Sequence, residues 1–65
     1  MKVTDDILNR FLEIMDENDE FIFGDRDYVK NQLEACLNTQ GYWSGCSIRV
    51  YYNKNTNNFS IERRF

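Results

Sequence analysis

The spacing of apolar residues changes once along this chain, and that change limits the folds that are open to it. Up to about residue 40, apolar residues recur at intervals of three and four, which is the period of a helix that buries one face. From Ser47 onward, apolar and polar residues alternate, which is the period of a half-buried β-strand. Helices followed by strands predict an α+β fold.

The first helix is predicted over about residues 5 to 18. Thr4 is a suitable N-cap, because its hydroxyl can accept a hydrogen bond from a first-turn N–H. Asp5 and Asp6 follow at the positive end of the helix, where carboxylates are favoured. The apolar stripe of this helix consists of Ile7, Leu8, Phe11, Leu12, Ile14 and Met15.

A second helix is predicted over about residues 26 to 39, with Asp25 as its cap. Gly41 is a natural stop, because glycine readily adopts the left-handed conformation that follows a helix. The apolar stripe of this helix consists of Val29, Leu33, Cys36 and Leu37.

Residues 20 to 24 lie between the two helices and contain the apolar run Phe21, Ile22 and Phe23. The run is too short for a helix and fits a short strand or a packed loop. We predict that these three side chains fill the core between the helices. The segment is also a candidate for a third strand of the sheet.

The C-terminal part predicts a β-hairpin, with strands over residues 47–52 and 59–65 and a polar turn between them. An isolated hairpin is only marginally stable in water, so this one must pack on the helices. The fold is therefore predicted as two helices packed on a small antiparallel sheet, in the order α-(β)-α-β-β. Its 65 residues are one domain.

A chain of this size buries only about 60% of the surface that it exposes when unfolded. Five Phe, four Tyr and one Trp can supply much of the core, because aromatic side chains bury a large area on few rotatable bonds. Trp43 is predicted as a core anchor.

Several classes of function are disfavoured by the residues that the chain lacks. Without histidine it cannot form a Ser-His or Cys-His catalytic pair, and Cys36 and Cys46 are too few for a closed zinc site. A calcium loop starting at Asp16 would need glycine at its sixth position, which is Phe21. We therefore predict no enzyme activity, no metal and no cofactor, and two free thiols.

No segment is long and apolar enough to span a membrane, and the first six residues contain no apolar signal core. The expected location is the cytoplasm, without membrane contact.

Charge is distributed unevenly along the sequence. Residues 1–34 contain ten acids and four bases, a net charge of −6, whereas residues 35–65 contain one acid and four bases, a net charge of +3. The total is the chain's net charge of −3. Such asymmetry points to a charged partner.

The favoured hypothesis is a binding protein whose carboxylates dock onto the basic, nucleic-acid-binding surface of a protein partner. In size and charge the chain is similar to small phage-encoded inhibitors of host enzymes. The predicted partner-binding residues are Asp6, Glu13, Asp16, Glu17, Asp19, Glu20, Asp25 and Asp27.

Two alternatives stay open. The outer face of the hairpin interleaves basic and aromatic residues, which is a pattern that holds single-stranded nucleic acid. The residues for that function are Arg49, Tyr51, Lys54, Arg63 and Arg64. Self-association is the other alternative, with aromatic residues forming the seam of a homodimer.

Overall fold

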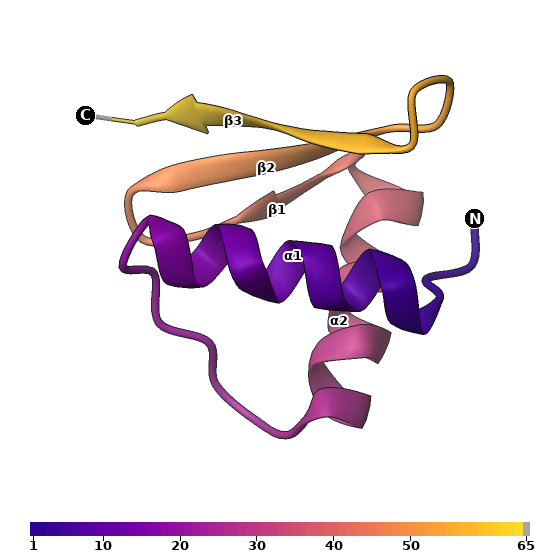
Figure 1. Ribbon diagram of the computed structural model, residues 1–65, viewed down its shortest axis with the longest axis horizontal. Helices are drawn as coiled ribbons and strands as arrows, with labels where there is room; N and C mark the ends of the chain where they lie inside the picture. Colours follow the sequence, from indigo (N-terminus) through magenta and orange to yellow (C-terminus); the bar gives the residue numbers. More distant parts are fainter. Residues whose placement is uncertain (65) are drawn as a thin grey trace.

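The computed structural model describes residues 1–64 and contains two helices and one three-stranded antiparallel sheet (Figure 1). The α+β class and the C-terminal hairpin are confirmed, and the helices begin and end within one residue of the predicted positions. Phe65, in the predicted return strand, lies outside the described residues. The elements are α1 (Asp5–Glu17), α2 (Arg26–Thr39), β1 (Tyr42–Ser44), β2 (Ile48–Asn53) and β3 (Asn58–Arg63).

The predicted caps form as the sequence indicates. The Thr4 side chain accepts a hydrogen bond from the Ile7 N–H at 3.3 Å, and Asp25 Oδ1 accepts one from the Tyr28 N–H at 2.9 Å. Each bond satisfies a backbone donor that the first turn of a helix leaves without a partner. Gly41 follows α2 with a φ of +86°, which glycine adopts without steric strain.

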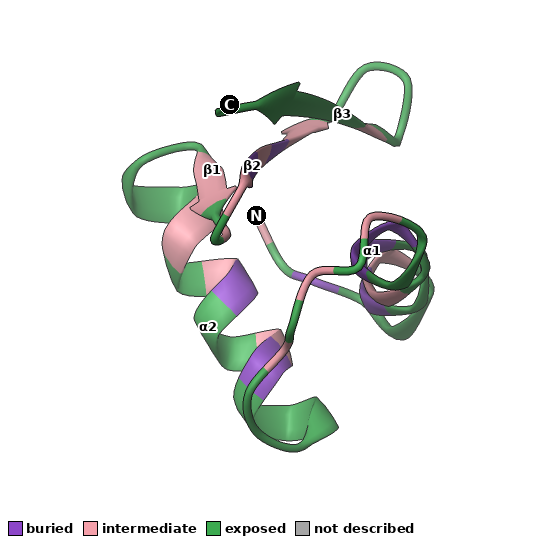
Figure 2. Ribbon diagram, turned by 90° about the vertical axis from the view of Figure 1, so that its left-hand side faces the viewer, coloured by how far each residue is buried: buried purple, intermediate pink, exposed green. Residues whose placement is uncertain are grey.

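The sheet has the order β1-β2-β3, and both helices lie on the same side of it (Figure 2). Val50, in the central strand, is opposite Trp43 on one side and Ile61 on the other. The other side of the sheet carries no helix (Figure 2).

The third strand of the sheet lies at a different place in the sequence from the one that we considered. Residues 20–24 form no strand, and the third strand is β1 instead. β1 is joined to β2 by residues 45–47, so the pairing forms between neighbouring segments. Trp43 also brings a large aromatic ring to the inner face, where it packs against the core as predicted.

Phe11 lies at the centre of the core and is fully buried. Its ring meets Trp43 edge-on, with centroids 5.2 Å apart, and Phe59 at 6.0 Å. It thereby connects α1 to both outer strands. The core cluster consists of Val3, Leu8, Phe11, Met15, Val29, Leu33, Ile48 and Val50.

The prediction that the run at residues 21–23 fills the core is wrong for both phenylalanines. Phe21 is 75% exposed and Phe23 is 79% exposed, whereas Ile22 between them packs against the core. Burial alternates along the segment, with Glu20 and Ile22 half-buried. Neighbouring side chains of an extended segment point in opposite directions, so the inward position of Glu20 turns both rings outward.

Replacing Phe11 by Ala should lower the free energy of unfolding by about 3–5 kcal/mol, because it removes a fully buried ring and leaves a cavity. Phe21→Ala, the matched control at an exposed ring, should change it by less than about 0.5 kcal/mol. Urea unfolding followed by circular dichroism measures both. Equal losses for the two variants would contradict this description of the core.

Candidate functional site

Three aromatic side chains project from the connection between the helices and from the start of α2. Phe21, Phe23 and Tyr28 form what we call the aromatic patch, and even Tyr28, the least exposed, is 52% exposed. The two phenylalanine rings lie 6.0 Å apart at 63° to each other, so they support one another. An open hollow of about 350 Å³ is lined by Phe21, Phe23, Tyr28, Gln32, Trp43, Ser44, Gly45 and Cys46.

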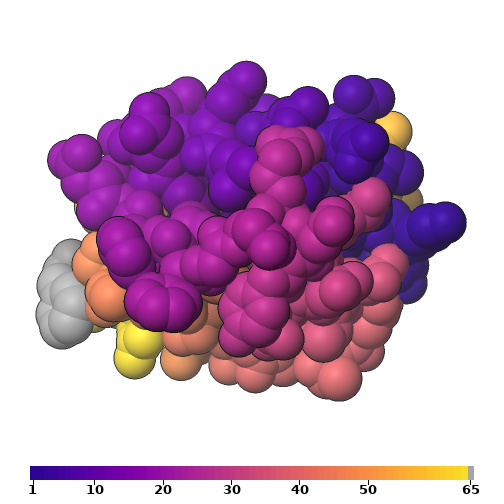
Figure 3. Space-filling view, turned by 90° about the horizontal axis from the view of Figure 1, so that it is seen from below, coloured from indigo at the N-terminus to yellow at the C-terminus, as the bar shows by residue number. Residues whose placement is uncertain are grey.

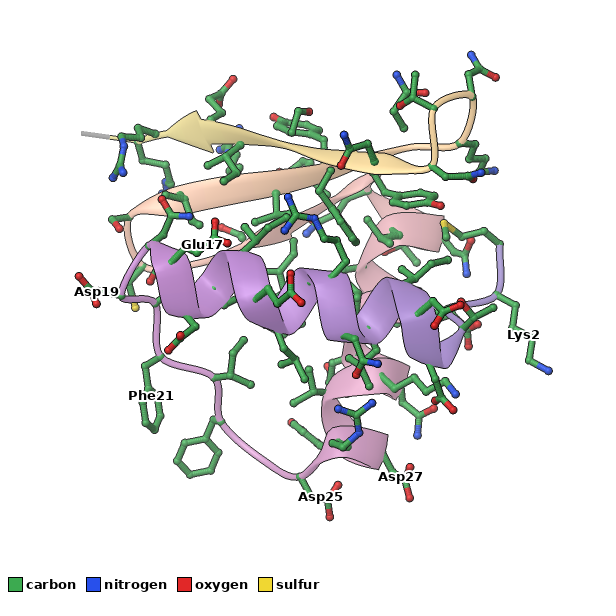
Figure 4. The ribbon with its side chains drawn as sticks, viewed as in Figure 1. Lys2, Glu17, Asp19, Phe21, Asp25 and Asp27 are labelled. Carbon is green, nitrogen blue, oxygen red and sulfur yellow. The ribbon has the colours of Figure 1, made fainter. Side chains whose placement is uncertain are left out.

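The space-filling view in Figure 3 shows the side of the molecule on which the connection between the helices and α2 reach the surface. In Figure 4, Phe21 points away from the body of the molecule. Apolar rings that are exposed and adjacent are typical of sites that bind another molecule.

One end of this connection is fixed by Glu20. Its Oε1 accepts hydrogen bonds from the Ser47 N–H at 2.8 Å, the Ser47 hydroxyl at 3.0 Å and the Ile48 N–H at 3.1 Å. The bond from the Ser47 backbone is the main cause of the lowered pKa of Glu20, since donors stabilise the ionised form, and burial opposes it only in part. Glu20 was predicted to face a partner, but it faces the turn between β1 and β2.

At the other end of the connection, the ring of Tyr28 lies close to Gly24. Gly24 has a φ of +104°, and a Cβ placed on it would lie 2.5 Å from Cδ2 of Tyr28. Only glycine allows both this backbone conformation and the close approach of the ring. The aromatic patch therefore lies on a connection that is anchored at Glu20 and leads into the capped first turn of α2.

The remaining predicted carboxylates differ in their surroundings. Arg10 lies 3.1 Å from Glu13 and 3.9 Å from Glu17, so these two charges are partly balanced within α1. Asp6 lines a different hollow beside β2 and β3, and Asp16 is exposed on α1.

Three of the predicted acids flank the aromatic patch in the sequence and in space. Asp19 lies just after α1, whereas Asp25 and Asp27 lie at the start of α2. Phe21 projects from the surface between Asp19 and the other two acids (Figure 4). All three are exposed. We call Asp19, Asp25, Asp27 and the aromatic patch together the docking face. Tyr28 was expected to border the acidic surface, whereas Phe21 and Phe23 were missed because an apolar run in a small protein usually lies in the core.

The basic residues predicted for nucleic acid are only partly brought together. Arg49 lies on the open side of the sheet with its Cζ 4.8 Å from the centre of the Tyr42 ring, and Tyr51 lies 5.4 Å from that ring. Arg64 donates to Ser44 Oγ at 3.3 Å. Tyr42 was missed because β1 was not predicted.

Arg63 and Lys54 do not join that group. Arg63 belongs to the side of the sheet that faces the helices, where it donates to Asn18 Oδ1 at 3.1 Å. Lys54 is exposed in the turn between β2 and β3.

Both cysteines are free thiols, with Cys36 half-buried and Cys46 exposed. Among residues 1–64, no group of three or more acidic or cysteine side chains is placed to hold a metal ion. In the same part of the chain, no helix has the length and apolar character needed to cross a membrane.

Comparison of the chain with protein-family models, with curated proteins and with solved structures found no match. A function must therefore be argued from the geometry of the surface itself.

The Glu20 contacts predict a pH dependence of stability. The folded-state pKa lies below the ordinary value of 4.5, so the ionised carboxylate stabilises the fold above pH 4.5. This contribution is lost as pH falls through the folded-state pKa. Glu20→Ala should lower the free energy of unfolding at neutral pH by about 1–3 kcal/mol, because two backbone donors lose their acceptor. Glu20→Gln should lower it less, because an amide oxygen still accepts hydrogen bonds.

Chemical unfolding of the wild type and of Glu20→Gln over a pH series tests this. The difference between the two should be constant above pH 4.5 and shrink below it. Asp16→Asn, an exposed site on α1, is the control and should leave the wild-type pH profile in place. A difference that stays constant into acid would contradict the role of the Glu20 charge.

Proposed function

We propose that this protein is a non-enzymatic binding protein. Its docking face would bind the surface of another protein. The observation that carries the proposal is the exposure of Phe21 and Phe23, at 75% and 79%, beside three exposed carboxylates. The partner surface that fits is an apolar cleft with a rim of Lys and Arg side chains.

Burial of the aromatic patch would supply most of the binding free energy. Two adjacent phenylalanine rings and a tyrosine offer a large apolar area, and aromatic residues dominate the energetics of many interfaces. The exposed rings stabilise this chain little on their own, because they lie outside its core. The fold turns these rings outward, and a partner would bury them.

The carboxylates would supply orientation and speed. Asp19, Asp25 and Asp27 lie around the aromatic patch, and the nearby base, Arg26, donates to Asn9 Oδ1 at 2.8 Å. The docking face therefore carries negative charge on a chain whose net charge is −3. Opposite charges on two proteins speed their encounter and select the correct orientation.

Pre-organisation favours the same function. Glu20 holds one end of the connection by three hydrogen bonds, and the capped first turn of α2 follows the other end. A connection that is already ordered loses less conformational entropy when it binds. The partner would thus meet rings that are already in position.

A partner whose basic surface normally binds nucleic acid would be inhibited by this contact, because carboxylates would occupy the place of phosphates. The effect would be stoichiometric, with one docking face for each blocked surface.

The proposal predicts that Phe21→Ser with Phe23→Ser abolishes capture of the partner, and that Asp19→Lys with Asp27→Lys weakens it strongly. Immobilised wild type and variants are exposed to cell lysate, and retained proteins are identified by mass spectrometry. The same charge change in Glu13→Lys with Glu17→Lys is the matched control and should leave capture intact, because these acids lie beside Arg10.

Circular dichroism establishes that each variant is folded. A retained protein that binds the phenylalanine variant as well as the wild type would refute the docking face. A partner that is lost only with the Glu13 and Glu17 reversal would place the contact on α1 instead.

A second candidate function is favoured by the open side of the sheet. Arg49 stacks on Tyr42, and Tyr51 lies beside that ring, on a surface that no helix covers. Bases of a single strand can stack on such rings while Arg49 and Arg64 contact phosphates.

That function predicts binding of a fluorescently labelled single-stranded oligonucleotide, which Tyr51→Ala weakens by about 1–3 kcal/mol through loss of stacking. Added salt should weaken it further, because phosphate contacts release counterions. Fluorescence anisotropy measures both effects, with Lys54→Ala as a control in the turn. An unchanged anisotropy on addition of the wild-type protein would exclude this function.

A further inference from the structure

The strand β3 forms a free edge of the sheet. β1, at the other edge, is three residues long and packs against α2, whereas β3 is six residues long and pairs on one side only, with β2 (Figure 1). Its register with β2 is continuous through six residue pairs, without a bulge. The chain also has no Pro. Bulges and prolines are common means by which soluble proteins protect a free edge.

The register shows which backbone groups of β3 point away from the sheet. The Arg64 N–H donates to the Ser47 carbonyl at 2.9 Å, and hydrogen-bonded positions alternate along an antiparallel pair. Ser60 and Glu62 therefore bond to β2, whereas the backbone groups of Phe59, Ile61 and Arg63 point outward. The Phe59 N–H accordingly donates to the side chain of Asn58, at 3.0 Å, and not to β2.

The side chains at the outward positions are those on the helix-facing side of the sheet. Ile61 is 40% exposed there, which shows that α1 does not cover this edge fully. Arg63, on the same face, donates to Asn18 Oδ1, just beyond α1. The edge thus combines outward-pointing backbone groups with an exposed apolar side chain.

We propose that β3 pairs antiparallel with β3 of a second copy of this chain, about a two-fold axis at Ile61. In that register Ile61 lies opposite its own copy, and Phe59 lies opposite Arg63 of the second copy. All three outward-pointing residues of each strand then pair with the second copy, and the Phe59 N–H exchanges Asn58 Oδ1 for the Arg63 carbonyl of that copy. Apolar side chains meet at the centre, and an arginine faces an aromatic ring on each side of it.

The charges of β3 disfavour the registers that are shifted toward its C-terminal end. With the axis at Ile61, Glu62 lies opposite Ser60 of the second copy, and no like charges are directly opposed. An axis at Glu62 or at Arg63 would place that charged side chain opposite its own copy, which is destabilising. The strand is thus complementary to itself, which is the requirement for a two-fold interface.

Replacement of Ile61 by Pro is the sharpest test. The Ile61 N–H points away from β2, so proline removes a donor that only the second copy uses, and edge strands tolerate proline at such positions. Sedimentation velocity over a range of concentrations should show the wild type rising to twice the chain mass of 7.9 kDa, while Ile61→Pro remains at the monomer mass. Ile61→Val keeps the N–H and should still associate.

Two further measurements make the result specific to β3. Phe21→Ser with Phe23→Ser should associate like the wild type, which separates this interface from the docking face. Amide hydrogen exchange, followed by NMR, should show protection of the Ile61 and Arg63 N–H groups that rises with concentration. That readout does not depend on the fold of any variant.

A wild type that stays monomeric at every concentration would overturn the proposal, whether or not the edge takes up an extended peptide of another protein. So would association that persists in Ile61→Pro, or exchange at Ile61 and Arg63 that does not respond to concentration.

Discussion

The Glu20 carboxylate decides how the connection between the helices is oriented, and the character of the surface follows from it. Two donors of Ser47 and one of Ile48 converge on its Oε1 atom, which ties the segment after α1 to the turn between β1 and β2. Because side chains alternate along the segment, the inward Glu20 places Ile22 inward and both phenylalanines outward. The turn is shaped for this contact, since a Cβ on Gly45 would lie 2.9 Å from the same oxygen.

The core leaves room for this arrangement because it is complete without the two phenylalanines. Phe11 contacts Trp43 and Phe59, and thus joins α1 to the sheet across its full width. In a domain that gains little from burial because of its size, two exposed rings are a considerable unused apolar area. This area adds little to the stability of the chain, and the proposed interaction with another protein rests on it.

Local patterns in the sequence predicted the elements well, because their causes are local. The cap at Thr4 and the stop at Gly41 depend only on neighbouring residues, and the hairpin follows from strict alternation. The errors arose where contacts between distant residues decide the outcome. Glu20 bonds to residues that follow it by 27 and 28 positions, and nothing near it in the sequence indicates those donors.

Only the charged residues of the candidate site were predicted fully, because contacts between distant residues decide which of the other side chains are exposed. The exposure of Asp19, Asp25 and Asp27 could be predicted from their residue type, since acidic side chains are usually exposed. The balance of Glu13 and Glu17 by Arg10 depends on helical spacing and could have been anticipated from intervals of three and seven residues. The exposure of Phe21 and Phe23 could not, because a run of apolar residues does not indicate which of its side chains point outward.

The separation of the proposed surfaces has a consequence for binding strength. The docking face lies on the connection between the helices, on the opposite side of the molecule from β3 (Figure 1). Two chains joined at β3 would therefore leave both docking faces accessible. A partner with two basic sites could bind both faces at once, and the second contact would then be intramolecular, which raises the overall affinity without any new type of contact. A small chain with a single pre-organised patch could in this way hold a large target firmly.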